Sequence, residues 1–158
     1  MEDAIAMYKR RASEALDSFL HTLSFVPADK LTWSPTPTAK SALQITAHCA
    51  GYSGGFAEVI RNGRFASNVE EFLGPIHARI ESITSLEQAE TMLRQGIADT
   101  LAALDKVRPE QVEAKIDTPH GAWPFTFFLN VPARHLNDHE AQLDYLQTCW
   151  GDLEVHLQ

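Results

Sequence analysis

Apolar residues recur every three or four positions in four separate stretches of the chain. This is the spacing of one buried helix face, whereas a half-buried strand would show alternation. Four amphipathic helices around one core predict an all-α four-helix bundle, forming a single domain over residues 1–158. The four predicted helices cover residues 3–25, 41–62, 85–107 and 125–150.

Local signals support the boundaries of the second and third predicted helices. Ser41 with Gln44, and Ser85 with Gln88, have the spacing of a capping box, in which two side chains satisfy the first free N–H groups of a helix. Gly63 follows the second helix as a glycine cap would. Several glycines at positions 51–55 are poor helix formers, so this helix must gain from close packing, within the chain or across a dimer.

The two longer connections differ in character. Residues 64–84 predict a crossover between helices that are not antiparallel neighbours, with one short helical piece at Val69 to Phe72. Residues 108–124 predict a non-helical segment with a short β-hairpin before the last helix. The hairpin is indicated by a turn at Thr118 to Gly121 and by the alternation of Val112, Ala114 and Ile116.

Composition and charge exclude several classes of protein. A hydrophobic content of 44% and a charged content of 22% are ordinary for a soluble globular protein. No long apolar run predicts a membrane span, and the acidic N-terminus does not resemble a signal peptide. The net charge of −8 without a basic stripe argues against nucleic acid and anionic membranes as partners. Two cysteines make no disulfide framework, so we expect a cytoplasmic protein.

Three histidines are predicted on apolar helix faces. In the last helix, His135 and His139 share a stripe with Phe128 and Leu146, and Gln142 lies on it too. The His-x-x-x-His spacing places two imidazoles about 6 Å apart, as chelation of one ion requires. The motif alone is weak, because seven histidines in this chain give about 0.3 such pairs by chance.

Two interpretations of the inward histidines remain open at this point. His48 lies on the apolar stripe of the second helix, beside Ile45 and Tyr52. With His135 and His139 it supplies three nitrogen ligands and leaves a coordination position open for water or substrate. The alternative is three independent core histidines, each hydrogen-bonded to a carbonyl or carboxylate. The other four histidines are weaker ligand candidates because they lie off the stripes or in connections: His21, His77, His120 and His156.

The order of these motifs resembles a known family. Leu31-Thr-Trp33 with Pro35, then Ser41 and His48, then His135-x-x-x-His139-x-x-Gln142, is similar to the DinB-like (YfiT-like) metal-binding four-helix-bundle superfamily. The resemblance covers nearly the whole chain. It implies an up-down-down-up bundle with a long crossover between its second and third helices, and a homodimer. Pro132 departs from the family pattern and should kink or restart the last helix before His135.

The resemblance also implies a chemistry for the histidines. It assigns His48, His135 and His139 as ligands of a divalent metal, which three imidazoles leave undetermined among zinc, nickel, copper and iron. Zinc or nickel is our preferred expectation, with iron or manganese as further candidates. Characterised relatives use low-molecular-weight thiols such as bacillithiol or mycothiol on small-molecule substrates. Tyr52 and Gln142 are the expected helpers, through a hydrogen bond to the ligand or to a histidine.

Three functions follow from this resemblance as expectations. The first is a metal-dependent transferase that activates a low-molecular-weight thiol against a small electrophile. The second is a metal-dependent hydrolase with metal-bound water as the nucleophile, for which no carboxylate stands out as a general base. Asp138 neighbours His139 and Glu58 lies near the inner part of the second helix, but we expect both to be solvated. The third is a non-catalytic, metal-stabilised dimeric bundle.

Overall fold

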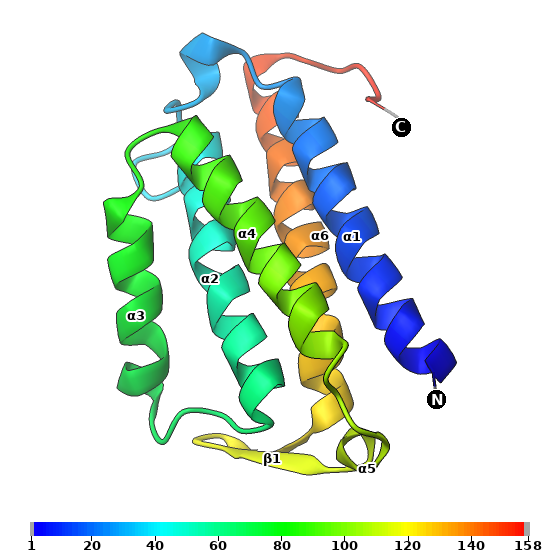
Figure 1. Ribbon diagram of the computed structural model, residues 1–158. Helices are drawn as coiled ribbons and strands as arrows, with labels where there is room; N and C mark the ends of the chain where they lie inside the picture. Colours follow the sequence, from blue (N-terminus) through cyan, green and yellow to red (C-terminus); the bar gives the residue numbers. More distant parts are fainter. Residues whose placement is uncertain (1, 157–158) are drawn as a thin grey trace.

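Helices form most of the chain, and one small hairpin precedes the last of them (Figure 1). The computed structural model describes the backbone of residues 2–156 and the side chains of residues 4–156. The elements of this part of the chain are α1 (Glu2–Ser24), the short 3-10 helix η1 (Ala28–Lys30), α2 (Ala42–Asn62), α3 (Val69–Ser82), α4 (Leu86–Leu104), α5 (Pro109–Val112), β1 (Lys115–Thr118), β2 (Gly121–Pro124) and α6 (Phe125–Trp150).

Four long helices form the bundle, in the predicted order. In Figure 1, α1 runs upward, α2 and α4 run downward and α6 runs upward, while α3 returns the chain from the lower end of α2 to the upper end of α4. This confirms the up-down-down-up topology and the long crossover. The main core cluster joins all four helices through side chains such as Phe19, Ile45, Leu93 and Leu136.

The capping signals are confirmed for α2 and only in part for α4. The Ser41 hydroxyl accepts from the N–H of Gln44 at 3.3 Å, and the N–H of Ser41 donates to Oε1 of Gln44 at 2.9 Å. Gly63 ends the helix with φ of 61°. At α4, Ser85 accepts from Gln88, but the Gln88 amide oxygen turns to the N–H of Thr84 instead.

The glycines of α2 permit close packing inside the chain. A Cβ added at Gly51 would lie 2.5 Å from Cγ1 of Ile80, and one added at Gly55 would lie 2.8 Å from Cδ1 of Ile76. Both isoleucines belong to α3, which lies beside α2 in Figure 1. The contact predicted from this poor helix-forming segment is therefore made within the chain, and dimerisation stays a prediction.

The crossover contains much more helix than the sequence predicts. Instead of one short piece at Val69 to Phe72, α3 extends over fourteen residues. Asn68 caps it by accepting from the N–H of Glu71 at 2.8 Å. The pair Gly74-Pro75 indicates a turn by sequence rules, yet both residues lie inside the helix, because burial of Ile76 against α2 outweighs the weak local propensity.

The segment before α6 also differs in part from its prediction. The hairpin is present, with Ile116 opposite Trp123 and Gly121 at φ of 106° in the turn. However, Val112 lies in the short helix α5 and not in the strand alternation assigned to it. Pro109 opens that helix, a position where a missing N–H costs nothing, and sequence alternation alone did not detect it.

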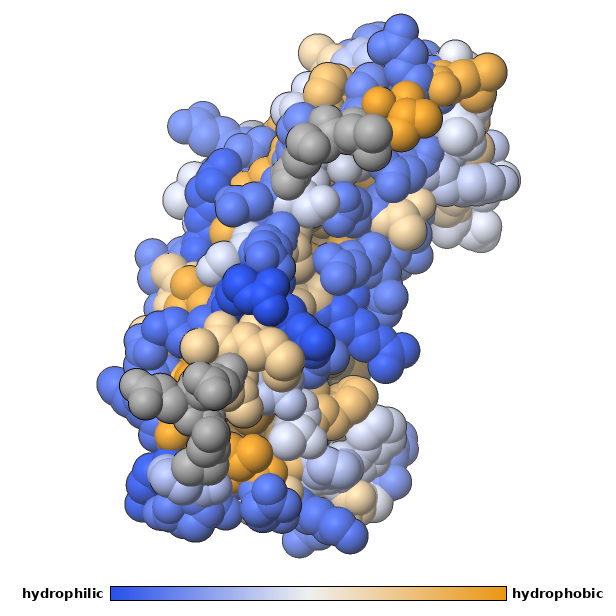
Figure 2. Space-filling model, turned by 90° about the vertical axis from the view of Figure 1, so that its right-hand side faces the viewer, coloured by the Kyte–Doolittle hydropathy of each residue, from blue (hydrophilic) through white to orange (hydrophobic). Residues whose placement is uncertain are grey.

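The side of the molecule that bears α1 is mainly hydrophilic, with small separate apolar areas (Figure 2). Charged side chains on the outer face of α1, such as Arg10 and Glu14, pair with each other at 3.1 Å. No helix in the described residues is both long and apolar enough to cross a membrane.

The contact between α2 and α4 generates a stability prediction. A Cβ at Gly96 would lie 2.6 Å from Cβ of Ser53 and 3.2 Å from the backbone nitrogen of Gly54. Gly96→Ala should therefore lower the free energy of unfolding by about 1–3 kcal/mol, although alanine favours helix over glycine. Urea denaturation measures this, with the exposed Arg94→Ala as control. A Gly96→Ala protein as stable as the wild type would contradict such close packing.

Candidate metal centre

Histidines from two helices far apart in the sequence meet at the contact between α2 and α6. Nε2 of His48 lies 3.2 Å from Nε2 of His135, across 87 positions of sequence. The ring centroid of His139 lies 4.6 Å from that of His48 and 4.5 Å from that of His135. One ligand nitrogen from each of the three lies within 4.8 Å of the others. The structure thus brings all three predicted ligand candidates together.

Gln142 fixes the hydrogen-bonding state of one histidine. Nδ1 of His139 lies 2.8 Å from Oε1 of Gln142, one helical turn later. An amide oxygen only accepts, so the His139 ring must donate its Nδ1–H. The lone pair of His139 is then on Nε2, the nitrogen that remains available to a ligand. Gln142 therefore has the helper position expected of it, although its side chain is exposed and not buried as predicted.

The histidines lie at the edge of the buried face of α6 and not at its centre. The centre is formed by Leu129, Leu136 and Leu143, each at most 1% exposed. At 100° per residue, His135 and His139 project roughly 60–100° from that line. All three histidines are consequently only partly buried. The predicted apolar face, which included His135 and His139, therefore overestimated how deeply these side chains are buried. In their observed position the imidazoles are within reach of a small molecule.

Pro132 does not restart α6. The helix is continuous from Phe125 to Trp150, and Pro132 is buried within it. Proline lacks the N–H that would bond to the carbonyl of Phe128, so one helical bond is lost. The expected restart of the helix before His135 is wrong, while the alternative of a kink stays a prediction; His135 lies beside His48.

The environment keeps two of the imidazoles neutral. Burial lowers the pKa of His135 to about 3, with further contributions from His139 and His48. Burial also lowers the pKa of His48 to about 4, helped by positive charge at His139, Lys40 and His77. A neutral imidazole has the lone pair that a metal needs, so protons compete little with an ion at neutral pH.

One pair of ligand nitrogens has a spacing that fits a divalent ion. For metal–nitrogen bonds of about 2.0–2.1 Å, the edge of a tetrahedron is roughly 3.3–3.4 Å. The 3.2 Å between the Nε2 atoms of His48 and His135 is close to that edge. Within the described residues, the cluster able to hold an ion consists of three histidines and no carboxylate. Three ligands leave a tetrahedral position for a fourth, which is typical of catalytic and not of structural sites.

Aromatic side chains flank the histidines. The Tyr52 ring lies 4.5 Å from His48 and 5.2 Å from His135, and Phe56 lies 5.3 Å from His135. Burial raises the pKa of Tyr52, so its hydroxyl stays protonated and able to donate a hydrogen bond. Sequence reasoning did not single out Phe56, though its four-residue spacing after Tyr52 was a usable signal. Phe72 lay in the short helical piece that was predicted, but nothing in the sequence indicated that this piece would pack beside α2.

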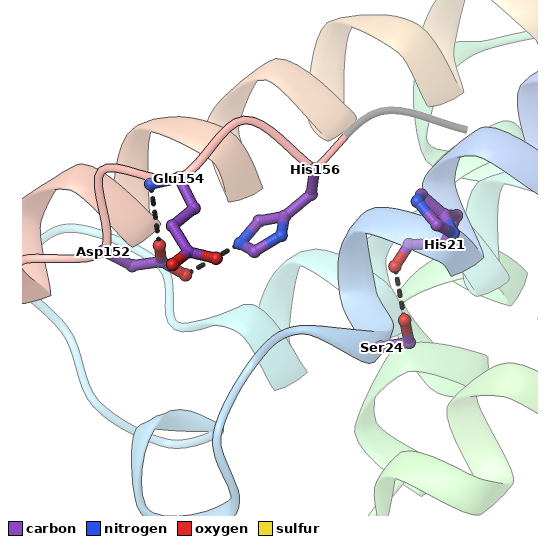
Figure 3. Close-up of polar contacts among 5 residues, drawn as sticks. All are labelled: His21, Ser24, Asp152, Glu154 and His156. Atoms are coloured by element: carbon purple, nitrogen blue, oxygen red, sulfur yellow. Dashed lines mark hydrogen bonds and ion pairs between the residues drawn. The ribbon is translucent and has the colours of Figure 1, made fainter.

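The other four histidines are not part of this cluster. His156 stacks on Phe25 with centroids 3.9 Å apart and bonds to Asp152 at 2.9 Å (Figure 3). This hydrogen bond joins two residues of the segment after α6 and lowers the pKa of Asp152, whereas the stack on Phe25 holds that segment against the residue that follows α1. His21 lies on α1 near the same contact, 5.0 Å from Phe25. His77 and His120 are exposed on α3 and in the hairpin turn.

The two carboxylates and the cysteine considered as reactive groups form ion pairs or pack in the core. Glu58 pairs with Arg79 at 2.8 Å, and Asp138 pairs with Arg134 at 3.6 Å, both near the surface. Cys49 adjoins His48 in sequence but is fully buried, and burial raises the pKa of its thiol. It therefore packs in the core as predicted and is a poor nucleophile.

The lowered histidine pKa values predict how stability depends on pH. In the unfolded chain these imidazoles bind protons near pH 6.5, but in the folded metal-free protein only near pH 4 and 3. The unfolded state binds more protons between these values, so acidification below about pH 6.5 should lower the free energy of unfolding. Urea denaturation with a chelator, at pH 7 and about pH 5, measures this.

Histidine variants test which groups cause this pH dependence of the free energy of unfolding. His48→Gln with His135→Gln should lose less stability on acidification than the wild type, whereas the exposed His120→Gln should behave as the wild type does. Equal losses in all three proteins would show that the two imidazoles are not the groups responsible.

Comparisons with known proteins agree with the fold. A DinB-like protein from Bacillus subtilis, YjoA, superposes with a TM-score of 0.62 at 17% identity, covering 97% of this chain and 95% of that one. A mycothiol-dependent maleylpyruvate isomerase superposes with a TM-score of 0.68 at 14% identity, covering 88% of this chain but 60% of the isomerase. At such identities the likeness concerns the fold alone. No curated protein matches the sequence.

A family model provides the assignment. The model described as the DinB superfamily matches residues 11–143, a range that includes α2 and most of α6 with all three clustered histidines. The chain belongs to the DinB superfamily.

Proposed function

We propose that this protein binds one divalent metal ion and transfers a low-molecular-weight thiol to small electrophiles. The observation that carries the proposal is the convergence of three imidazole nitrogens within 4.8 Å at the contact between α2 and α6. Two of the three are held neutral by their surroundings, and the third has its ligating tautomer set by Gln142.

His48, His135 and His139 would hold the ion, with zinc or nickel as the preferred metal. A divalent ion held by neutral ligands keeps its charge, and so lowers the pKa of a thiol that reaches it. Side chains around the ion would orient its ligands and the reacting molecule. Gln142 fixes the His139 ring, and the Tyr52 hydroxyl can donate to the electrophile as negative charge develops there.

The thiol part of the proposal rests on two supports. One structural neighbour is named as a mycothiol-dependent isomerase. In addition, thiol transfer needs no carboxylate base at the metal, and the described cluster contains none. Hydrolysis would need such a base, and no contact of the histidine cluster with a carboxylate favours that reaction. The expected homodimer and the cytoplasmic location stay predictions.

Metal binding can be tested without knowing a substrate. Protein made without affinity-tag nickel should contain about one ion per chain by elemental analysis. His48→Ala and His139→Ala should each lose most of it, because two imidazoles bind an ion much more weakly than three. His120→Ala should retain the wild-type content. Unchanged stoichiometry in both ligand variants would reject this ligand set.

Thiol transfer is tested by following the loss of free bacillithiol or mycothiol in the presence of chlorodinitrobenzene. The sulfur bonds to the ring carbon, chloride leaves and the thiol proton passes to solvent. Metal-loaded protein should accelerate this reaction, thorough metal removal should abolish the acceleration, and Tyr52→Phe should reduce it about tenfold or more with metal content unchanged.

The outcomes separate the proposal from its alternatives. Full activity after metal removal would end the metal-dependent mechanism. A protein that binds metal and gains thermal stability from it, yet turns over neither thiols nor a panel of esters, amides and lactones, would instead be a metal-stabilised bundle.

A further inference from the structure

Two aromatic side chains beside the histidines take no part in the hydrophobic core. Tyr52 and Phe56 belong to neither of the two core clusters, although both lie on α2 in the middle of the bundle. Both side chains are partly exposed. By contrast, Phe19 and Phe125 are at most 1% exposed and fill the core. Large apolar rings left partly in water beside a polar cluster indicate a surface kept for a ligand.

These rings continue from the histidines toward α3. The Phe56 ring lies 5.3 Å from His135, 5.8 Å from Tyr52 and 6.5 Å from Phe72 of α3. Phe72 in turn lies 4.5 Å from Phe65 in the connection before it. Such spacings are those of aromatic rings in edge or tilted contact. An apolar aromatic surface therefore adjoins the three imidazoles on the side that faces α3.

A small hollow lies beyond this surface. Phe65 and Phe72 line a cavity of about 110 Å³ between α2 and α3, together with Gly55. A Cβ at Gly55 would lie 2.8 Å from Cδ1 of Ile76 and 3.5 Å from Cε2 of Phe72. The close packing of α3 at this glycine is therefore made by Ile76, and Phe72 lies beside it at an ordinary packing distance.

We propose that the molecules bound at the histidine cluster carry a planar aromatic or conjugated group next to the atom that binds the metal, and that Phe56 selects them. This inference rests on the proposed metal site and specifies its ligand class. A planar group covers the Phe56 and Tyr52 rings from water when its metal-binding atom reaches the imidazoles. A ligand without such a group leaves these rings exposed and gains nothing from them.

Hydroxamates test this inference because their head group chelates a metal whatever the attached group. The dissociation constants of acetohydroxamate, benzohydroxamate and cyclohexanecarbohydroxamate are measured by calorimetry on zinc-loaded protein. Benzohydroxamate should bind about tenfold or more tightly than acetohydroxamate and more tightly than the cyclohexyl compound.

Variants locate the source of the preference. Phe56→Ala should reduce the phenyl preference to less than about threefold, leaving acetohydroxamate affinity and zinc content unchanged. Phe56→Leu, which restores apolar bulk without a ring, should recover only part of it. Phe127→Ala is the matched control, because Phe127 is also a partly exposed phenylalanine but contacts Trp123 and Phe128 instead of the histidines, and it should keep the full preference.

The results distinguish this inference from the metal site on which it rests. Absence of zinc and of binding by every hydroxamate would overturn both. Tight acetohydroxamate binding with no phenyl preference, with an equal preference for the cyclohexyl group, or with a preference that Phe56→Ala leaves intact, would overturn the ligand class alone.

Discussion

Close approach of neighbouring helices to α2 is the constraint on which the structure depends. This helix packs against α3, α4 and α6, and its buried positions are mostly alanine, glycine and serine. Small side chains let three neighbours approach one helix, but they bury little apolar surface each. Much of the apolar surface buried on α2 must therefore come from its neighbours, and two isoleucines of α3, Ile76 and Ile80, fill the space that the α2 glycines leave. Without this proximity His48 could not meet two side chains of α6.

The same packing explains why the histidines are chemically suited to a metal. A polar group forced into a core needs a partner, and a cationic imidazole there is costly. At the edge of the buried face the cost is smaller, yet burial still disfavours protonation of His48 and His135. The site thus combines neutral nitrogen donors with access from outside, and neither a fully buried nor a fully exposed position would provide both.

Much of this arrangement could be predicted from the sequence, because helix periodicity and capping residues determine it locally. Helix periodicity located the four bundle helices, and Ser41 and Gly63 set the ends of α2 as expected. The family pattern named the three histidines that meet. The predictions that failed concern segments whose conformation depends on tertiary contacts. Gly74-Pro75 read as a turn, because the burial of Ile76 on a glycine face of another helix leaves no local signature. Pro132 was expected to kink or restart the last helix, yet α6 continues through it with the proline buried.

In the candidate metal site too, local features could be predicted from the sequence and features that depend on packing could not. The His-x-x-x-His spacing predicted that two imidazoles share one face, but their depth depended on where the leucines of α6 are directed. The hydrogen bond from His139 to Gln142 lies within one helical turn and was accessible to sequence reasoning. The contact of Phe72 with Phe56 depends on a helix that was only partly foreseen.

Because α3 lies outside the four-helix core, its positions other than Ile76 and Ile80, which pack on the α2 glycines, can change with less cost to the bundle. The imidazoles come from α2 and α6, while part of their apolar surroundings comes from α3. Substitutions on α3 can therefore alter the part of these surroundings that Phe72 provides, while the imidazoles stay in place. Tyr52 and Phe56 lie on α2 with His48, so a change to the path of that helix would move an imidazole and its aromatic neighbours together.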